Sequence, residues 1–308
     1  MEGRFTAPGK IILFGEHAVV YGKPAIAIPV SGMRATAWSE PGENGITINA
    51  MDMNKRFKLK TDNNQFSVLA QSILAITGRH EPNLTINLTS RLPQGSGMGS
   101  SAATSTAVCR ALSGHLGVDL AANQISELVF KAEKIVHGTP SGIDNTVVAY
   151  EMPVYFVKGK KPRTFDPGNI FRLVIGDTGI EASTKKTVAN VRKAWEKEPR
   201  LMKGYFDEIE KVTRNGKIAL EKGDRELVGE LMDENHKLLN SIGVGHKSLE
   251  KLIDIAHEEG ALGAKLTGGG GGGNMVALAE DKKSQKKIYD AITEAGYRAY
   301  QTSFGERP

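Results

Sequence analysis

The 308-residue sequence predicts an α+β protein, with helices and strands mixed along the chain in one large or two medium-sized domains. Short apolar or alternating runs, such as 11–14 and 84–88, predict buried and half-buried strands. Apolar residues at helical spacing, as over 65–77, predict amphipathic helices between them. Glycines fill 268–273 between two further strand-like segments, which favours a loop that faces a ligand over a flexible linker.

The first half of the chain is expected to alternate between strands and helices. Strands are predicted at 11–14, 24–30, 34–38 and 84–88, a polar strand region after residue 40, and helices at 65–77, 101–116 and 119–137. The last helix carries one apolar stripe: Ile125, Leu128, Val129, Ala132 and Val136. Glu133 flanks this stripe, so its carboxylate is either exposed, paired with a basic side chain, or bound to a metal.

The second half has the same mixture. Strands are predicted at 172–175, 264–267, 275–278 and 297–303, and helices from 183–185 onward, around 205–212, over 227–242, over 249–256 and over 288–295. The apolar segments on either side of the glycines are too short to be domains, so the glycines are expected to connect paired strands.

Composition limits the classes of partner. The chain is 40% hydrophobic and 24% charged with a formal net charge of +5, which could favour an anionic small molecule but shows no basic and aromatic strip for nucleic acid. The single cysteine, Cys109, excludes an intrachain disulfide and a cysteine-rich metal site, and is expected to pack in the core. No secretion signal and no membrane-length apolar segment is visible, so we expect a soluble cytoplasmic protein without a membrane partner.

The stretch 93–103, PQGSGMGSSAA, follows a predicted strand and opens a predicted helix. Glycines let main-chain N–H groups approach a ligand, and a helix start adds unpaired donors, so this order suits a phosphate group. A glycine-rich surface turn is the alternative. The stretch is not a Walker A loop, does not supply the Rossmann GxGxxG pattern, and is not accompanied by protein-kinase HRD and DFG motifs.

Two other stretches hold ionisable residues beside apolar ones. Lys10, Glu16 and His17 lie at the two ends of the short strand predicted at 11–14. Asp144 follows a turn that contains Pro140 and two glycines, where it could cap the next helix or act in a site.

Four motifs resemble those of the GHMP kinase superfamily, and within it the mevalonate kinases of the short, archaeal type. They are PGKIILFGEHAVVYG at 8–22, PQGSGMGSSAA at 93–103, HGTPSGIDN at 137–145 and KLTGGGGGGNM at 265–275. The first and third of these favour the mevalonate kinases over other members. The unbroken glycines at 268–273 depart from the family pattern, which usually includes an alanine, and this leaves the rigidity of the loop open.

The resemblance implies a fold, a reaction and an assembly. It implies an N-terminal domain over 1–165 like the second domain of ribosomal protein S5, a ferredoxin-like C-terminal domain over 166–308, and an active site in the cleft between them. The implied reaction is transfer of a phosphoryl group from ATP to mevalonate, with Mg²⁺ as cofactor. A homodimer is also implied.

Residue roles follow from the same resemblance. ATP would be bound by Pro93, Gln94, Gly95, Ser96, Gly97, Met98, Gly99, Ser100, Ser101, Ala102 and Ala103. Ser101 and Glu133 would hold Mg²⁺, whose preferred ligands are oxygen atoms. Asp144 would accept the proton of the acceptor hydroxyl, with Lys10 beside it to stabilise the phosphoryl group in transfer.

The acceptor would be bound by Lys10, Glu16, His17, Asp144 and Thr184. His17 and Thr184 could donate hydrogen bonds to the mevalonate carboxylate or hydroxyls, whereas Glu16 would orient its neighbours. Three alternatives stay open: another kinase of the superfamily acting on phosphomevalonate, homoserine or a sugar, a decarboxylase similar to diphosphomevalonate decarboxylase, and a nucleotide-binding regulator without activity. A regulator would be expected to lack Lys10, Glu133 or Asp144, and all three are present.

Overall fold

The structure is a computed structural model, and it describes residues 3–59, 61–93, 97–138, 140–181 and 184–306. These residues form two compact units, one drawn from within 1–10, 33–94 and 98–151 and the other mainly from 11–32 and 152–308. The division differs from the expected boundary after residue 165, because 11–32 and 152–165 group with the C-terminal half.

Two long strands explain this interleaving. Strand β1 (Phe5–Phe14) begins in the first unit, strand β2 (Pro24–Pro41) ends there, and both have their other parts in the second unit. The sequence predicted shorter strands, with a break in β2 between residues 30 and 34. The structure contradicts that break: Gly32 stays extended, and a Cβ there would lie 2.5 Å from the carbonyl oxygen of Gln301. Gly32 therefore permits close approach of another backbone and does not make a turn.

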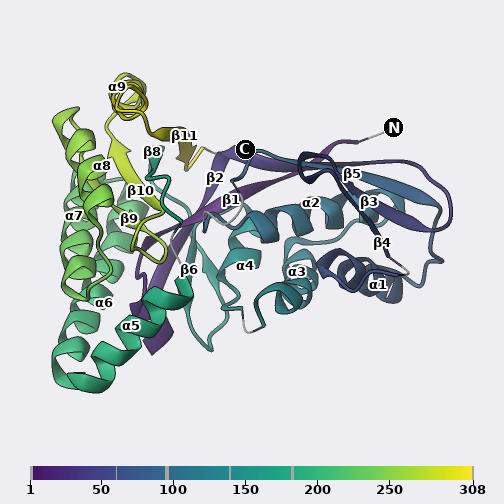
Figure 1. The fold of residues 1–308 in the computed structure, drawn as a ribbon, viewed down its shortest axis with the longest axis horizontal. Helices are drawn as coiled ribbons and strands as arrows, with labels where there is room; N and C mark the ends of the chain where they lie inside the picture. The colour runs from purple at the N-terminus through teal and green to yellow at the C-terminus, as the bar shows by residue number, and fades with distance from the viewer. Residues whose placement is uncertain (1–2, 60, 94–96, 139, 182–183, 307–308) are drawn as a thin grey trace. The chain divides into compact units, whose positions relative to one another are not determined.

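The first unit pairs a sheet with a layer of helices. Its other elements are β3 (Ile46–Ala50), β4 (Lys55–Lys58), α1 (Gln65–Thr77), β5 (Leu84–Ser90), α2 (Ser100–His115), α3 (Ala122–His137) and α4 (Ile143–Tyr150), with a short helix η2 (Met51–Met53). Strand β5 pairs antiparallel with β2 and parallel with β3, and β3 pairs antiparallel with β4. The four helices lie together on one face of these strands (Figure 1).

Local sequence explains where these helices begin. The Asn64 side chain accepts hydrogen bonds from the N–H groups of Phe66 and Ser67, which caps α1 where the sequence predicts its start. In α3, the predicted stripe is buried except at its end: Val136 is 47% exposed, because the helix ends one residue later. Cys109 is fully buried in α2, and burial raises its pKa to about 12, as expected for a packing residue.

The second unit is built on two groups of strands and several long helices. Its other elements are η1 (Ala18–Tyr21), β6 (Val154–Val157), β7 (Arg163–Thr164), β8 (Phe171–Asp177), α5 (Thr184–Lys197), α6 (Pro199–Lys222), α7 (Arg225–Ser241), α8 (Lys247–Glu258), β9 (Gly263–Thr267), β10 (Asn274–Ala279), α9 (Lys282–Glu294) and β11 (Arg298–Phe304). The sequence did not predict β6 and β7, which are short and pair with β2 and with each other.

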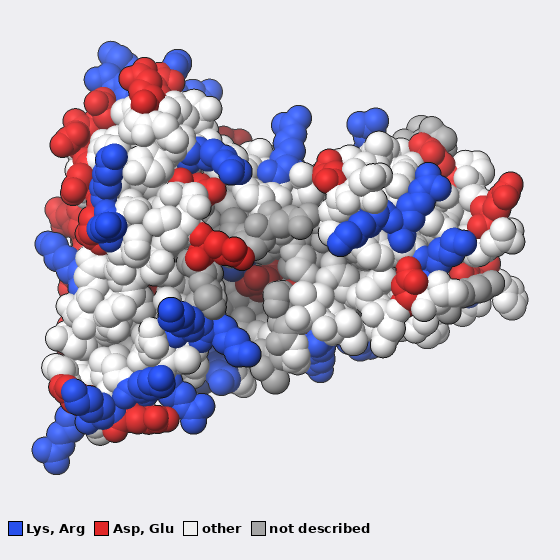
Figure 2. Space-filling view, in the orientation of Figure 1, with Lys and Arg blue, Asp and Glu red and all other residues white. Residues whose placement is uncertain are grey.

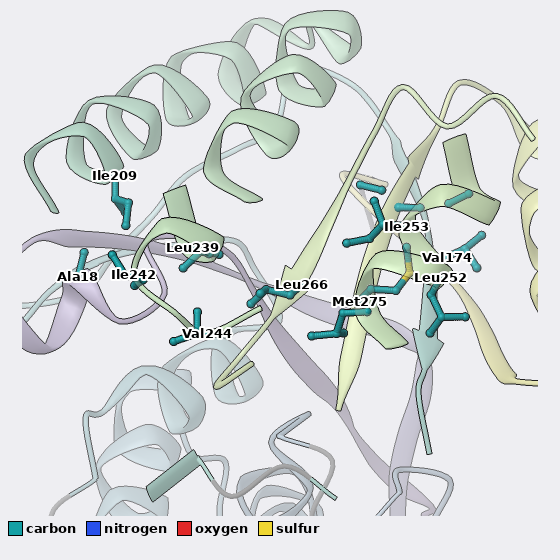
Figure 3. Packing of buried hydrophobic residues seen from close by; sticks show 14 of the residues in the cluster. Ala18, Val174, Ile209, Leu239, Ile242, Val244, Leu252, Ile253, Leu266 and Met275 are labelled. Carbon is teal, nitrogen blue, oxygen red and sulfur yellow. The ribbon is translucent and has the colours of Figure 1, made fainter. Parts of the chain in front are cut away.

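The sheet of β8 to β11 has the strand order β11-β8-β10-β9, and every pair in it is antiparallel. Counted along the chain this is the β-α-β-β-α-β arrangement of a ferredoxin-like fold, as the resemblance implied. One hydrophobic cluster fills the space between this sheet and the helices beside it. Figure 3 shows Leu266 and Met275 from the strands facing Leu239 of α7 and Leu252 of α8. Each such buried side chain contributes roughly 1.5–3 kcal/mol to folding.

Charge is distributed in patches of both signs. On the face shown in Figure 2, lysine and arginine side chains are interspersed with acidic ones, and no continuous basic strip crosses the coloured residues. Among the residues that the structure describes, no helix is both long enough and apolar enough to cross a membrane.

Candidate active site

In the first unit, a lysine and an aspartate predicted to act together lie in contact. Lys10 is on β1, where its N–H donates to the carbonyl of Met98 over 2.9 Å. Its side chain passes so close to Gly99 that a Cβ there would lie 2.8 Å from Lys10 Cγ. Lys10 Nζ is 3.1 Å from Asp144 Oδ1, with the lysine side chain 7% exposed and the aspartate 34% exposed. The pair therefore presents a carboxylate to solvent and keeps its cation buried.

Asp144 is fixed by the way α4 begins. The helix N-cap is Gly142, at φ 88°, and the N–H of Ile143 donates to Ser141 Oγ over 3.3 Å, so Asp144 is a residue of the first helical turn and does not serve as the cap. Asn145 Nδ2 donates to the carbonyl and to Oγ of Ser126 in α3, at 3.0 and 2.8 Å. These bonds hold the turn against α3. They leave the Asp144 carboxylate at the positive end of a helix, where negative charge is stabilised.

The residues predicted to hold a metal also meet in this unit. Ser101, in the first turn of α2, donates from Oγ to Glu133 Oε1 of α3 over 2.6 Å. Glu133 is only 2% exposed, so the sequence alternative of an exposed glutamate is excluded. Ser101 Oγ is also 3.0 Å from Gln65 Oε1 at the start of α1. A hydroxyl has one proton to donate, and Glu133 is the nearer acceptor, so the Gln65 amide is better placed with its NH₂ group toward Ser101.

The described part of the glycine-rich stretch forms the start of α2. Gln94, Gly95 and Ser96 lie outside the described residues. Gly97 and Gly99 have φ values of 72° and 71°, and α2 begins at Ser100. The first N–H groups of a helix have no partner within it, so the start of α2 offers main-chain donors beside Lys10 and Ser101. Among the described residues, no group of three or more His, Cys, Asp or Glu side chains could hold a metal ion.

In the second unit, Glu16 is buried in a set of polar contacts. The Glu16 side chain is fully buried, and its Oε1 pairs with Lys265 Nζ, whose side chain is likewise inaccessible. Its Oε2 accepts a 3.0 Å hydrogen bond from Asn235 Nδ2 of α7. Burial lowers the pKa of Lys265, and the charge of Glu16 opposes that change. Both carboxylate oxygens of Glu16 are thus engaged within the protein.

His17 has an unusual backbone conformation. Its φ is 60° and its ψ −49°, and the N–H of Ala18 donates to the carbonyl of Glu16 over 2.6 Å. This is the rarer, strained form of the γ-turn, with His17 at its centre. A positive φ is costly for a residue with a side chain and persists only where neighbouring structure holds it.

The ring of His17 is held by the glycine run. Its Nε2 lies 3.0 Å from the carbonyl oxygen of Gly269, and burial lowers the pKa of His17, so the neutral ring predominates near pH 7. A carbonyl oxygen can only accept, so Nε2 carries the proton and Nδ1 becomes an acceptor. The sequence analysis expected His17 to donate a hydrogen bond to the acceptor; in the neutral ring the Nε2 proton is directed at Gly269, which leaves Nδ1 as an acceptor.

Thr184 meets the same glycine run. It is the first residue of α5, and a Cβ at Gly269 would lie 2.7 Å from its Oγ1. Of the glycines at 268–273, only Gly269 has no positive φ, so it is the one position where an alanine would adopt the backbone without strain. The run is also anchored, since the N–H groups of Gly271 and Gly273 donate to the carbonyls of Val244 and Ile180. Unbroken glycines thus form a defined loop here.

Three residues of these contacts escaped the sequence analysis. Gln65 is a polar residue at a helix start, with nothing in the sequence to connect it to Ser101. Lys265 lies in β9, whose residues are all buried, and Asn235 lies among apolar residues of α7. A charged residue in a buried strand and an amide on a buried helix face both indicate an internal partner. Those two irregularities were the available signal.

Comparison with known proteins identifies the family. The family "GHMP kinases N terminal domain" matches residues 66–151, and "GHMP kinases C terminal" matches 217–298. The class of protein is therefore a GHMP kinase, an enzyme that transfers phosphate to an alcohol.

A mevalonate kinase of Thermococcus gammatolerans is 39% identical over an alignment 316 positions long, which covers 94% of this chain and 92% of the relative. The structure of L. major mevalonate kinase in complex with R-mevalonate matches with a TM-score of 0.84 and 30% identity, covering 98% of this chain and 96% of that one. Methanococcus jannaschii mevalonate kinase matches with a TM-score of 0.86 and 27% identity, covering 100% and 99%. The chain belongs to the mevalonate kinase family of GHMP kinases.

Proposed function

We propose that this chain phosphorylates (R)-mevalonate with ATP, giving 5-phosphomevalonate for isoprenoid biosynthesis. The observation that carries the proposal is the pair of Lys10 on β1 and Asp144 on α4, beside the start of α2, in a chain whose relatives are named mevalonate kinases. Phosphoryl transfer needs a group that accepts a proton and groups that stabilise negative charge. The partly exposed carboxylate, the buried cation and the main-chain donors supply them.

Asp144 acts as the base in this proposal. The primary hydroxyl of the acceptor attacks the terminal phosphorus of ATP, the new O–P bond forms as the bond to the ADP oxygen breaks, and the hydroxyl proton passes to the Asp144 carboxylate. A positioned base of this kind contributes about 10²–10⁴-fold to the rate. The ammonium of Lys10, 3.1 Å from Asp144 Oδ1, places positive charge where the phosphoryl group is transferred.

Mg²⁺ fits the oxygen pair of Ser101 and Glu133. This ion binds few protein ligands and keeps water and substrate phosphates in its other positions, so a hydroxyl and one carboxylate 2.6 Å apart are sufficient. Ser101 and Glu133 would hold the ion, and Gln65 would orient the Ser101 hydroxyl. Bound Mg²⁺ would neutralise charge on the ATP phosphates. The main-chain donors of α2 and the rest of 93–103 would bind those phosphates.

The acceptor is proposed to contact His17 and Thr184. Neutral His17 would accept a hydrogen bond at Nδ1 from a hydroxyl of mevalonate, and Thr184 would donate to its carboxylate. Glu16 is proposed to orient His17 without contacting the acceptor, because its oxygens already bind Lys265 and Asn235.

A substrate panel tests the proposal. Purified protein, ATP and Mg²⁺ are incubated with mevalonate, phosphomevalonate, homoserine or galactose, and ADP release is measured. We expect ADP release with mevalonate and none with the other three acceptors. Turnover with another acceptor and none with mevalonate would replace the proposed substrate. CO₂ release from diphosphomevalonate would indicate a decarboxylase, and ATP binding with no turnover would indicate a regulator.

Assembly and location remain predictions from the resemblance. A homodimer is measured by analytical ultracentrifugation of the purified protein, where a single species at the monomer mass would contradict it. A cytoplasmic location is tested by fractionation of the native cells.

A further inference from the structure

The γ-turn at His17 is strained and immobilised from several sides. On one side, Glu16 is bound by Lys265 and Asn235. After the turn, Tyr21 stacks on Phe206 with ring centroids 4.5 Å apart. A strained backbone conformation held by several neighbours is a common feature of functional sites, where it keeps a side chain in one position.

The two residues that bind Glu16 come from a rigid platform of α7 and β9. Lys265 Nζ also donates to the carbonyl of Leu266 over 2.6 Å, while the N–H of Leu266 donates to His236 Nδ1 over 3.4 Å. The N–H of Ala264 donates to Asp233 Oδ1 over 2.8 Å. These hydrogen bonds fix Lys265 and Asn235 relative to each other without involving Glu16.

We infer that Lys265 and Asn235 are positioning residues for the acceptor: they clamp the Glu16 carboxylate so that the strained turn presents His17 Nδ1 to a substrate hydroxyl. Both are fully buried, so neither touches the substrate. The inference rests on the proposed function of His17, and it assigns a role in acceptor binding to a lysine and an asparagine that the reaction itself does not use.

The geometry favours this role over one in folding alone. An ion pair replaced by apolar groups is often neutral for stability, so stability by itself gives little reason to place a charged pair here. The clamp instead fixes both oxygens of Glu16, one by charge and one by an amide, which prevents rotation of its carboxylate. Because Glu16 directly precedes His17, such fixation determines the orientation of the turn.

The experiment measures KM for mevalonate, KM for ATP and kcat in Lys265→Met and Asn235→Leu, well below each variant's unfolding temperature. If the clamp positions His17, KM for mevalonate rises about three- to tenfold in both variants, the loss expected for one hydrogen bond between neutral groups, while KM for ATP stays within twofold. Lys23→Met is the matched control. It removes a lysine that binds Asp207 and Glu210 near the same turn, without contacting Glu16, and should leave both KM values unchanged.

Unchanged KM for mevalonate in folded Lys265→Met and Asn235→Leu would overturn the inference, as would equal increases for both substrates. If Lys265→Met fails to fold, Asn235→Leu and Glu16→Gln/Lys265→Met carry the test. If the double variant regains stability but keeps the raised KM for mevalonate, the result supports a positioning role. If it regains both wild-type stability and wild-type KM for mevalonate, the result contradicts that role. The wild type is assayed in parallel. Its failure to use mevalonate would refute the proposed function, and the clamp would then be tested with the acceptor that the panel identifies.

Discussion

Each of the two units contains a buried lysine paired with a carboxylate, Lys10 with Asp144 and Lys265 with Glu16, and the pairs differ in what surrounds the carboxylate. Asp144 is 34% exposed at the start of a helix, with Lys10 on one side. Glu16 is inaccessible, with Lys265 on one oxygen and Asn235 on the other. A carboxylate that reaches solvent can exchange a proton with a substrate, whereas one that is fully engaged can act only through the residues it holds. We therefore propose that similar pairs serve chemistry in one unit and positioning in the other.

Replacing the exposed carboxylate gives the largest expected effect. Asp144→Asn keeps an oxygen acceptor for Lys10 but removes the base, so kcat should fall by about 10²–10⁴-fold. The unfolding temperature should change little, because the Asp144 side chain is partly exposed. Steady-state assays and thermal unfolding measure the two quantities. Near-normal turnover in this variant would refute the assignment of Asp144 as base.

Replacing one partner of the buried pair should lower the free energy of unfolding. The loss should be similar in size to the increase in activation free energy caused by Asp144→Asn. Lys265→Met leaves the Glu16 carboxylate buried without its cation, and breaking such a pair costs about 3–5 kcal/mol of unfolding free energy. The combined variant Glu16→Gln/Lys265→Met removes both charges and should recover most of that loss. Urea denaturation measures both variants. Equal destabilisation of the single and double variants would show that charge is not the cause.

Ser101 and Glu133 offer a third comparison within the first unit. Glu133→Gln keeps the size of a buried side chain but removes the charge that would bind Mg²⁺, so the Mg²⁺ concentration for half-maximal activity should rise at least about tenfold. Glu151→Gln is the matched control, since Glu151 binds Arg34 and Arg110 away from Ser101. An unchanged Mg²⁺ requirement in Glu133→Gln would assign its carboxylate a structural role.

The two pairs also differ in how far the sequence could predict them. Helical periodicity predicted α1 correctly, because the apolar pattern begins directly after Asn64, which caps the helix. The resemblance of the motifs predicted the contact between Lys10 and Asp144. The length of β2 could not be predicted, because a glycine such as Gly32 usually indicates a turn. Only the structure shows that β11 packs against it. The clamp on Glu16 was equally hidden: its partners lie 219 and 249 positions further along the chain, and no local pattern connects them.

The strained turn can also be tested through pH, with a smaller effect. Burial holds the pKa of His17 below its usual 6.5 in the folded chain, so between these two values the unfolded chain binds more protons. The stability that neutral His17 contributes is therefore complete above pH 6.5 and is lost as pH falls, by up to about 1.4 kcal/mol per pH unit. His17→Gln removes this proton uptake and should flatten the slope. His236, whose pKa burial also lowers, is retained in both chains, so the difference between their urea midpoints across pH isolates His17. Parallel profiles for the two proteins would show that His17 is not held neutral by the fold.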